Sequence, residues 1–297
     1  MRKLLILAAI LFLLAAAVMG ARTWREHTRR QAEEEAYREL AQAVTLTEPE
    51  TGTQEEGEPE EASALTTEIP EDLVEPSEIP DPDSASPLPT HKHDFDALQR
   101  ENEDCVGWIR IEDTEVDYPV MYTPEEPQRY LHRAFSGEYG FSGVPFLDCR
   151  SGLFIGNRII HGHAMKNGTM FGDLKSYLKK DYLEEHPLLE FETADGCESY
   201  AVFAVVKTTW EDPWYSFLDA ASEEKYGEAI GRLMAEATQT TKTIPVYGDR
   251  LLTLSTCYGR SGSGGRLLIV AKEVRPTWEE QSTCESPGSS PGESAGN

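Results

Sequence analysis

The stretch LLTLSTCYGRSGSGGRLLIVA, residues 251–271, consists of two apolar runs joined by a glycine-rich loop. Each run has the length and the aliphatic content typical of a buried strand. Cys257 stands at the end of the first run, and Arg266 stands at the start of the second. We therefore predict strands at 251–256 and 266–274, with the cysteine and the arginine brought to one end of a sheet by the loop.

Cys257 is the first candidate for chemistry. A cysteine at a strand end can be exposed to a substrate while its backbone is held in place, and thiolate chemistry requires that exposure. Taken alone, a cysteine at such a position is more often part of a buried core. The hydroxyls of Ser255 and Thr256 beside it, and the loop that leads to Arg266, favour a nucleophile.

Arg266 begins an otherwise apolar run, LLIVA, so it belongs at the rim of the sheet. Arginine is permanently cationic and offers a fork of donors, which suits it to hold the oxyanion formed when a thiolate attacks a carbonyl. An ordinary surface arginine is the structural alternative. Arg260 lies inside the loop, where it would be poorly preorganised, so Arg266 is our candidate.

His161 and His163 flank Gly162 at the end of a third predicted strand, RIIH at 158–161. Histidines at positions i and i+2 of a strand face the same side, so a metal site must be considered. No CxxC or HxxxE pattern supplies further ligands, and we predict no metal and no cofactor. A histidine within reach of Cys257 would instead exchange its proton and protonate a leaving amine.

The chain around these motifs alternates short strand-like runs with a few helical ones. Eight short strands with helices only in the connections are typical of a closed or partly closed β-barrel, a mainly β (α+β) fold. Besides the two strands above, we predict strands at 107–112, 116–121, 144–147, 158–161, 189–193 and 198–209, and helices at 95–101, 174–186 and 222–238.

The N-terminus predicts attachment to a membrane. Arg2 and Lys3 precede an uncharged apolar run of eighteen residues, Leu4–Ala21, about 27 Å long as a helix. We predict a signal-anchor or transmembrane segment at 1–21, with a cleaved secretory signal as the alternative. A charged helical stalk is predicted at 22–45.

Residues 46–90 hold fourteen Asp or Glu, eight of the eighteen prolines and no Lys or Arg. Such a segment cannot bury enough apolar surface to become ordered, so we predict a disordered, acidic linker that acts as a spacer. The catalytic domain then occupies 91–276, and a tail at 277–297 is also predicted to be disordered. The net charge of -26 argues against nucleic acid as a partner.

The five cysteines are an odd number, so at least one stays unpaired in an oxidising compartment. An exported thiol that is kept free needs a reason, and catalysis supplies one. Together with the N-terminal segment, this predicts a single-pass protein of the cell membrane with an extracellular catalytic domain.

Several of these segments resemble the sortases, and most closely their class B branch. HGHAMKNGTMFGDL (161–174) is similar to the class B histidine motif, and LTLSTC (252–257) is similar to the TLxTC cysteine motif. Arg266 before LLIVAK matches the arginine that precedes the last strand in that family. VGWIRIEDTEVDYPVM (106–121) resembles the opening strands, and 210–238, which begins WEDPWYSF, lies where class B inserts a helix.

The resemblance implies an eight-stranded sortase barrel with peripheral helices and with His163, Cys257 and Arg266 as catalytic residues. It implies cleavage of a C-terminal sorting signal after Thr, a thioacyl enzyme, and transfer of the surface protein to an amine of a cell-wall precursor or a pilin. The class often has an aromatic residue before its Gly-His pair, where this chain has His161. Our candidates for substrate contacts are Ser255, Thr256, His161 and Tyr258.

Three other functions remain open from the sequence. An extracytoplasmic cysteine endopeptidase would use the same three residues but release a hydrolysed product. A non-enzymatic envelope binding module would need no reactive thiol. A zinc hydrolase would use His161, His163 and Cys257 as ligands.

Overall fold

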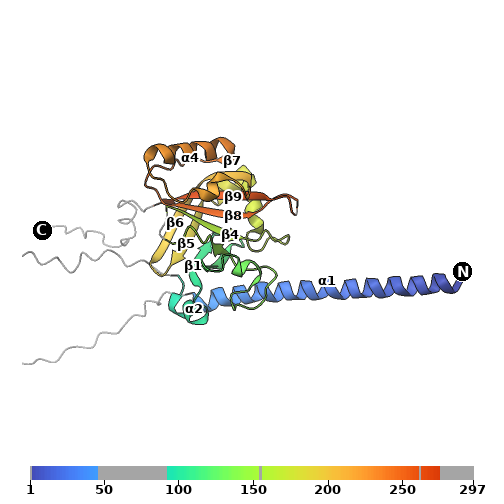
Figure 1. Ribbon diagram of the computed structural model, residues 1–297. Coiled ribbons are helices and arrows are strands. Elements are labelled where there is room, and N and C mark those ends of the chain that lie inside the picture. Colours follow the sequence, from blue (N-terminus) through green and yellow to red (C-terminus); the bar gives the residue numbers. More distant parts are fainter. Residues whose placement is uncertain (1, 46–91, 154–155, 261, 275–297) are drawn as a thin grey trace, which may run out of the picture.

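The computed structural model describes residues 2–45, 92–153, 156–260 and 262–274 (Figure 1). The linker predicted at 46–90 and the tail predicted at 277–297 lie outside these residues. The described helices are α1 (Arg2–Val44), α2 (Phe95–Glu101), α3 (Lys180–Glu185) and α4 (Glu223–Glu236), with 3₁₀ helices η1 (Arg129–His132), η2 (Gly172–Leu178) and η3 (Pro213–Ser216). The described strands are β1 (Cys105–Arg110), β2 (Asp117–Met121), β3 (Phe146–Leu147), β4 (Asn157–Gly162), β5 (Leu188–Thr193), β6 (Gly196–Thr209), β7 (Ala237–Thr240), β8 (Leu251–Cys257) and β9 (Gly265–Val274).

The strands form one sheet in the order β5-β1-β2-β3-β4-β8-β9-β6-β7. β5 also pairs with β6 in antiparallel register, from Leu188↔Ala201 to Thr193↔Gly196. This pairing closes the first eight strands of that order into a barrel, which confirms the predicted eight-stranded barrel. β7 extends the sheet beyond β6. The sequence predicted a helix up to residue 238 in this place, so β7 was not predicted. The helix instead ends at Glu236, and Ala237 adopts extended backbone.

Most predicted elements are present within a few residues of their expected bounds. α2 begins and ends where expected, and the side chain of Asp94 caps it by accepting a hydrogen bond from Ala97 N–H at 2.9 Å. The single helix predicted at 174–186 is instead divided into η2 and α3. The division falls at Lys179, which has extended backbone (ψ 132°) and therefore interrupts the helix.

Two apolar clusters, one on each face of β9, explain why the run RLLIVA forms a strand. In β9, Leu267 and Ile269 face the main core cluster inside the barrel, whereas Leu268 and Val270 face a second cluster. α4 covers that second cluster with Ile230 among others, and Figure 1 shows it lying across the outer face of β6 and β9. A strand covered on both faces is apolar at every position. The run RLLIVA is thus the signature of a central, two-sided strand.

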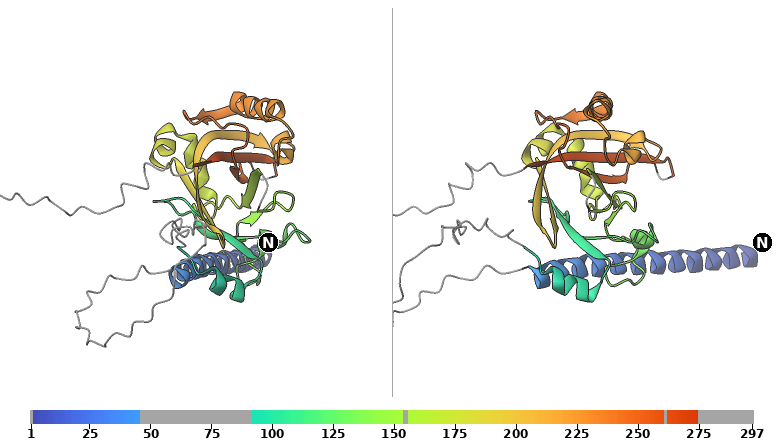
Figure 2. Two further views of the ribbon diagram at one scale, coloured as in Figure 1. Left: turned by 90° about the vertical axis from the view of Figure 1, so that its left-hand side faces the viewer. Right: turned by 60° about the vertical axis from the view of Figure 1, so that its left-hand side comes forward.

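α1 is one continuous helix whose N-terminal part projects away from the barrel (Figures 1 and 2). In the part of the chain that the structure describes, no helix has an apolar stretch long enough to cross a bilayer, so the span predicted at 1–21 is not supported. The helix expected at 22–45 is present. However, its last turns do not form a free stalk, because Tyr37 and Val44 are buried in the main core cluster.

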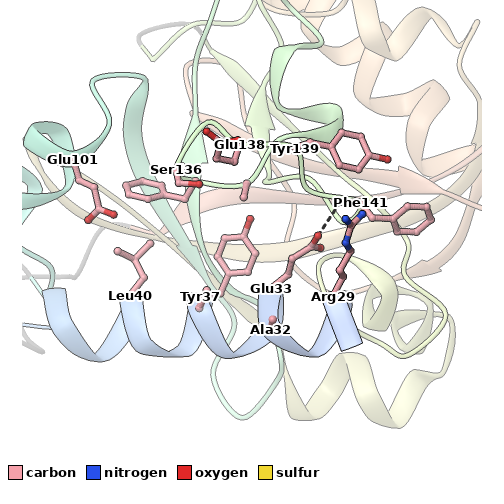
Figure 3. Close-up of a pocket in the computed structure, with 13 residues that line it drawn as sticks. Arg29, Ala32, Glu33, Tyr37, Leu40, Glu101, Ser136, Glu138, Tyr139 and Phe141 are labelled. Atoms are coloured by element: carbon pink, nitrogen blue, oxygen red, sulfur yellow. Dashed lines mark hydrogen bonds between the residues drawn. The ribbon is translucent and has the colours of Figure 1, made fainter. Parts of the chain in front are cut away.

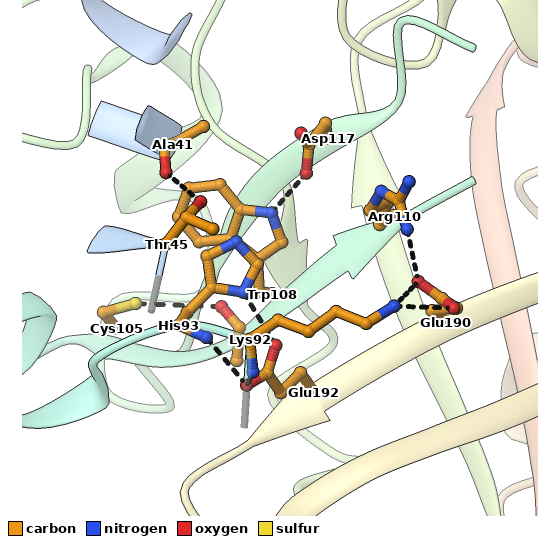
Figure 4. Close-up of polar contacts among 11 residues, drawn as sticks. Ala41, Thr45, Lys92, His93, Cys105, Trp108, Arg110, Asp117, Glu190 and Glu192 are labelled. Atoms are coloured by element: carbon orange, nitrogen blue, oxygen red, sulfur yellow. Dashed lines mark hydrogen bonds and ion pairs between the residues drawn. The ribbon is translucent and has the colours of Figure 1, made fainter. Parts of the chain in front are cut away.

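The described residues on either side of segment 46–91 lie close together (Figure 4). Thr45 and His93 form an antiparallel bridge, and Asp94 N–H donates to Val44 O at 2.8 Å. His93 is fixed there by its Nδ1, 2.7 Å from a carboxylate oxygen of Glu192, and by its ring, stacked 4.2 Å from that of Trp108. The segment itself lies outside the described residues. The linker therefore stays a prediction, and what the described residues show is that α1 docks directly on the domain through Tyr37 and Val44.

Candidate active site

Three neighbouring strands carry the predicted catalytic residues to one rim of the barrel. β4 and β8 run parallel and are paired from Asn157↔Leu251 to Gly162↔Thr256. The residues that follow the last pair, His163 and Cys257, therefore leave the sheet at the same end. β8 and β9 run antiparallel, and Cys257 is the register partner of Arg266. Adjacent register partners project from the same face of a sheet.

All three side chains line one groove of about 760 Å³. Cys257 is exposed, whereas Ser255 and Thr256 before it are only 2% and 3% exposed. The strand therefore holds the backbone up to residue 256 and presents the sulfur at its end, as thiolate chemistry requires. The other residues that line the groove are Pro127, Gln128, Leu131, Phe146, Asp148, Cys149, Arg150, His161, Gly162, Trp210, Glu211, Asp212, Tyr215, Ser216, Ser255 and Thr256.

The hydroxyls of Ser255 and Thr256 are already engaged within the protein. Thr256 Oγ1 donates to Gly162 O at 2.8 Å, which ties the end of β8 to the end of β4. Ser255 Oγ lies 2.7 Å from the hydroxyl of Tyr215, and both atoms are buried. These two residues line the groove, but their hydroxyls serve to fix its wall.

His163 is held by the backbone of η1. Its Nε2 lies 2.8 Å from Leu131 O, and because a carbonyl accepts, Nε2 carries the proton. Nδ1 is then the nitrogen left to exchange a proton with a reacting group. Burial and the neighbouring His132, whose ring stacks 5.3 Å away, together lower the pKa of His163 although the Leu131 contact raises it. The imidazole is consequently neutral at neutral pH.

His161 belongs to a different set of contacts. Its Nε2 lies 3.1 Å from Asp148 Oδ2, and its ring stacks on that of Tyr215 at 6.0 Å. Burial alone would raise the pKa of Asp148, but hydrogen bonds from Arg150 and His161 hold it well below its usual range. His161 is thus fixed in the wall of the groove by the Asp148 carboxylate. It lines the same groove as His163, which is held by a different group, the Leu131 carbonyl.

The side chain of Arg266 brings a positive charge to the groove. Its Nη1 donates to Gly265 O at 3.0 Å, and no carboxylate of the described residues forms an ion pair with it. A cation beside Cys257 is suited to stabilise negative charge that develops on a substrate oxygen. Within the same described part of the chain, no three His, Cys, Asp or Glu side chains are grouped closely enough to hold a metal ion.

Tyr258 is placed apart from the other candidates for substrate contact. It packs against the main core cluster, and the ammonium of Lys207 lies 5.2 Å from the centre of its ring. It is not among the described residues that line the groove. The structure therefore brings Ser255, Thr256 and His161 to the groove and leaves Tyr258 outside it.

Sequence reasoning missed the residues that hold the two histidines. Leu131 acts through its backbone carbonyl, which leaves no trace in the type of side chain. Asp148 and Tyr215 do carry a signal, because Asp148 follows a predicted strand and Tyr215 lies in the aromatic segment WEDPWYSF. Both are nevertheless recognisable only once β3, β4 and η3 have been placed around the groove.

The rim therefore presents an exposed thiol, a neutral imidazole and a guanidinium, the set expected of a cysteine enzyme of acyl transfer. A sortase-domain family model matches residues 109–274, more than half of the chain. The chain belongs to the sortase family, whose members are cysteine transpeptidases.

Its relatives are of the class B type. Sortase B of Listeria monocytogenes is 35% identical over 180 residues, which cover 60% of this chain and 72% of the relative. Sortase B of Staphylococcus aureus is 32% identical over 184 residues, which cover 61% of this chain and 75% of the relative. The solved complex of Staphylococcus aureus sortase B with substrate matches with a TM-score of 0.58 at 31% identity, covering 62% of this chain and 85% of that one.

Proposed function

We propose that this transpeptidase cleaves a C-terminal sorting signal after Thr and joins the surface protein to an amine of a cell-wall precursor or a pilin. The observation that carries the proposal is the groove of about 760 Å³ in which Cys257, His163 and Arg266 meet. It is open to a peptide, and its catalytic residues lie on strand ends fixed by continuous register.

In the first half-reaction, the Cys257 thiol gives its proton to Nδ1 of His163 and its sulfur attacks the scissile carbonyl. The carbonyl oxygen takes up the electron pair and is stabilised by Arg266. When the C–N bond breaks, the imidazolium proton passes to the leaving amine. The products are a thioacyl enzyme, a released C-terminal peptide and a neutral His163.

In the second half-reaction, an incoming amine attacks the thioacyl carbon and gives a proton to His163. The C–S bond breaks, the new amide forms and the proton returns to the Cys257 sulfur. The lowered pKa of His163 supports this cycle, because the neutral imidazole can accept a proton at either step and the imidazolium is a ready donor.

Relatives support both substrates of the proposal. One solved sortase B is a substrate complex, and another is complexed with triglycine. In this chain, we assign the groove wall formed by His161, Ser255 and Thr256 to contact with the sorting signal. His161 offers a polar, anchored ring there, whereas the two hydroxyls act by fixing the wall.

The experiment uses peptides from a library of sorting-signal sequences, incubated with the full chain in the presence and absence of an amine. Mass spectrometry is expected to show a ligated product that contains the amine, cut after Thr. Hydrolysis with no ligation at any amine concentration would instead identify a cysteine endopeptidase, which is the alternative function.

We also propose that the chain is held at the cell membrane by residues 1–21 with the catalytic domain outside. The support is the sequence, in which Arg2 and Lys3 precede an uncharged run of eighteen residues. Fractionation of cells and protease treatment of intact cells test this. The domain should sediment with membranes and be degraded from outside, and recovery in the cytosolic fraction would contradict it.

A further inference from the structure

The last turns of α1 lie against the loop that follows η1, beside a cavity of about 720 Å³ (Figure 3). Glu33 accepts two backbone hydrogen bonds there, from Phe141 N–H at 3.0 Å and from Ser142 N–H at 3.2 Å. Charge-assisted bonds of this kind are stronger than neutral ones. A carboxylate of α1 therefore fixes the backbone of the loop that directly follows η1, the helix whose Leu131 holds His163.

Tyr37 makes the next contact along the same helix. Its hydroxyl donates to Gly143 O at 3.1 Å, and burial raises its pKa so that it stays protonated. Gly143 has a positive φ of 62°, and a Cβ added to it would lie only 2.6 Å from Leu131 O. Gly143 is thus packed directly on the carbonyl that receives the Nε2 proton of His163.

A second set of contacts leads from α1 to the backbone of His163. The ring of Tyr37 packs edge-on against Tyr118 at 5.7 Å, and the Tyr118 hydroxyl accepts from Met170 N–H at 3.0 Å. The next residue, Phe171, donates its N–H to His163 O at 2.9 Å. α1 is therefore connected to His163 by two series of contacts. One reaches the imidazole through Gly143 and Leu131, and the other reaches the peptide group through Tyr118 and residues 170–171.

We propose that Glu33 and Tyr37 are positioning residues for His163. Docked α1 holds the Leu131 carbonyl in place, and that carbonyl sets which nitrogen of His163 carries the proton and how the ring faces Cys257. The inference rests on the proposed function of the groove. It makes the N-terminal helix a part of the catalytic apparatus, acting through the loops.

The test compares the full-chain variants E33Q, Y37F and the double variant with the wild type. E35Q is the matched control, because Glu35 is exposed on the same helical turn. The first readout is the long-range ¹H–¹⁵N spectrum of histidine-labelled protein across the pH range, with His163 assigned by substitution. Among titratable or charged groups, His132 stacks on the His163 ring, and those that line the same groove are Cys257, Arg266, His161, Asp148, Arg150, Glu211 and Asp212.

The expected result is that the wild type and E35Q show the Nε2–H tautomer of His163 with a lowered pKa. In E33Q and Y37F the tautomers should mix and the pKa of His163 should fall further, because the Leu131 contact that raises it is loosened while its burial and His132 remain. The second readout is kinetic: kcat should fall about tenfold, a part of what a general acid–base group contributes, with KM little changed. Thermal unfolding gives the folded fraction to which each rate is referred.

The proposal is overturned if His163 in the double variant titrates like that in E35Q, or if kcat falls only as the folded fraction does. The spectra also separate this proposal from the proposed function. If the wild type ligates no peptide, the transpeptidation assignment fails, while the tautomer of His163 still decides whether α1 positions it.

Discussion

Cys257 and Arg266 are direct cross-strand partners at the last register pair of β8 and β9. The eight-residue loop between them returns the chain to the same rim, so the sulfur and the guanidinium enter one groove from adjacent strands. The position of the cation relative to the nucleophile is therefore fixed by the barrel itself and does not depend on the loop.

This relationship predicts a graded response at Arg266. R266Q should lower kcat by about a hundredfold to a thousandfold, the cost of removing one preorganised oxyanion donor. The kcat of R266K should lie between those of the wild type and R266Q, because lysine keeps the charge but loses the fork of donors. Steady-state kinetics on a ligated peptide measures both. R260Q is the control in the neighbouring loop, and an equal loss in R260Q would show that the charge acts at long range.

Gly162 should tolerate no side chain, because a Cβ there would lie 2.5 Å from the ring of Phe171. We expect G162A to lower the free energy of unfolding by about 1–3 kcal/mol, as overpacking does, and to reduce kcat by displacing His163. Urea unfolding and kinetics check the two effects. G227A in α4 is the control, since nothing lies within 4 Å of its added Cβ. Stability of G162A equal to the wild type would contradict the packing described here.

Thr253 connects a buried polar network beneath the groove. Its Oγ1 accepts from Trp214 Nε1–H at 3.1 Å and donates to Asn157 Oδ1 at 2.9 Å. T253V keeps the shape but leaves both partners buried without a hydrogen bond, so we expect a loss of about 1–3 kcal/mol in the free energy of unfolding. Chemical denaturation measures it. T240V, on the exposed part of β7, should change stability little, and similar losses in both variants would disprove the network's role.

Asp148 should make stability depend on acid. Hydrogen bonds from Arg150 and His161 hold its pKa in the folded state well below the unfolded value. The contribution of Asp148 to the free energy of unfolding is therefore fully present above about pH 4 and is lost as the pH falls below that value. D148N should lower the free energy of unfolding by about 1–3 kcal/mol at pH 7.

Urea unfolding at pH 7, 5 and 3 checks the sign of that effect. The difference between the wild type and D148N should be constant at pH 7 and 5 and shrink at pH 3. D181N, at an exposed position of α3, is the control for the loss of one negative charge. A difference that grows on acidification would mean that the carboxylate is not stabilised in the folded state.

Much of the barrel and of the rim was accessible from the sequence. The run LLIVA has to be a strand covered on both faces, and a short loop must return Arg266 to the end of the strand that carries Cys257. These relationships are local in the chain, so residue type and spacing were enough to predict them. The bounds of α2 were predictable for the same reason, because Asp94 supplies a local cap.

The remainder depends on contacts between distant segments. The carbonyl of Leu131 holds His163 across 32 positions, and Glu33 reaches the backbone of Phe141 across 108. A backbone group has no signature in the sequence, and a glutamate on a charged helix is indistinguishable from a solvated one. The docking of α1 and the bridge between Thr45 and His93 were missed for this reason.

The most direct test of the central claim is to trap the acyl enzyme and locate the acyl group. The full chain is mixed with a sorting-signal peptide without amine, quenched in acid, digested and analysed by mass spectrometry. The account predicts a thioester on Cys257, no label on Cys105, Cys149 or Cys197, and loss of the adduct when an amine is added before the quench. An acyl group on another residue, or turnover in C257A equal to the wild type, would contradict it.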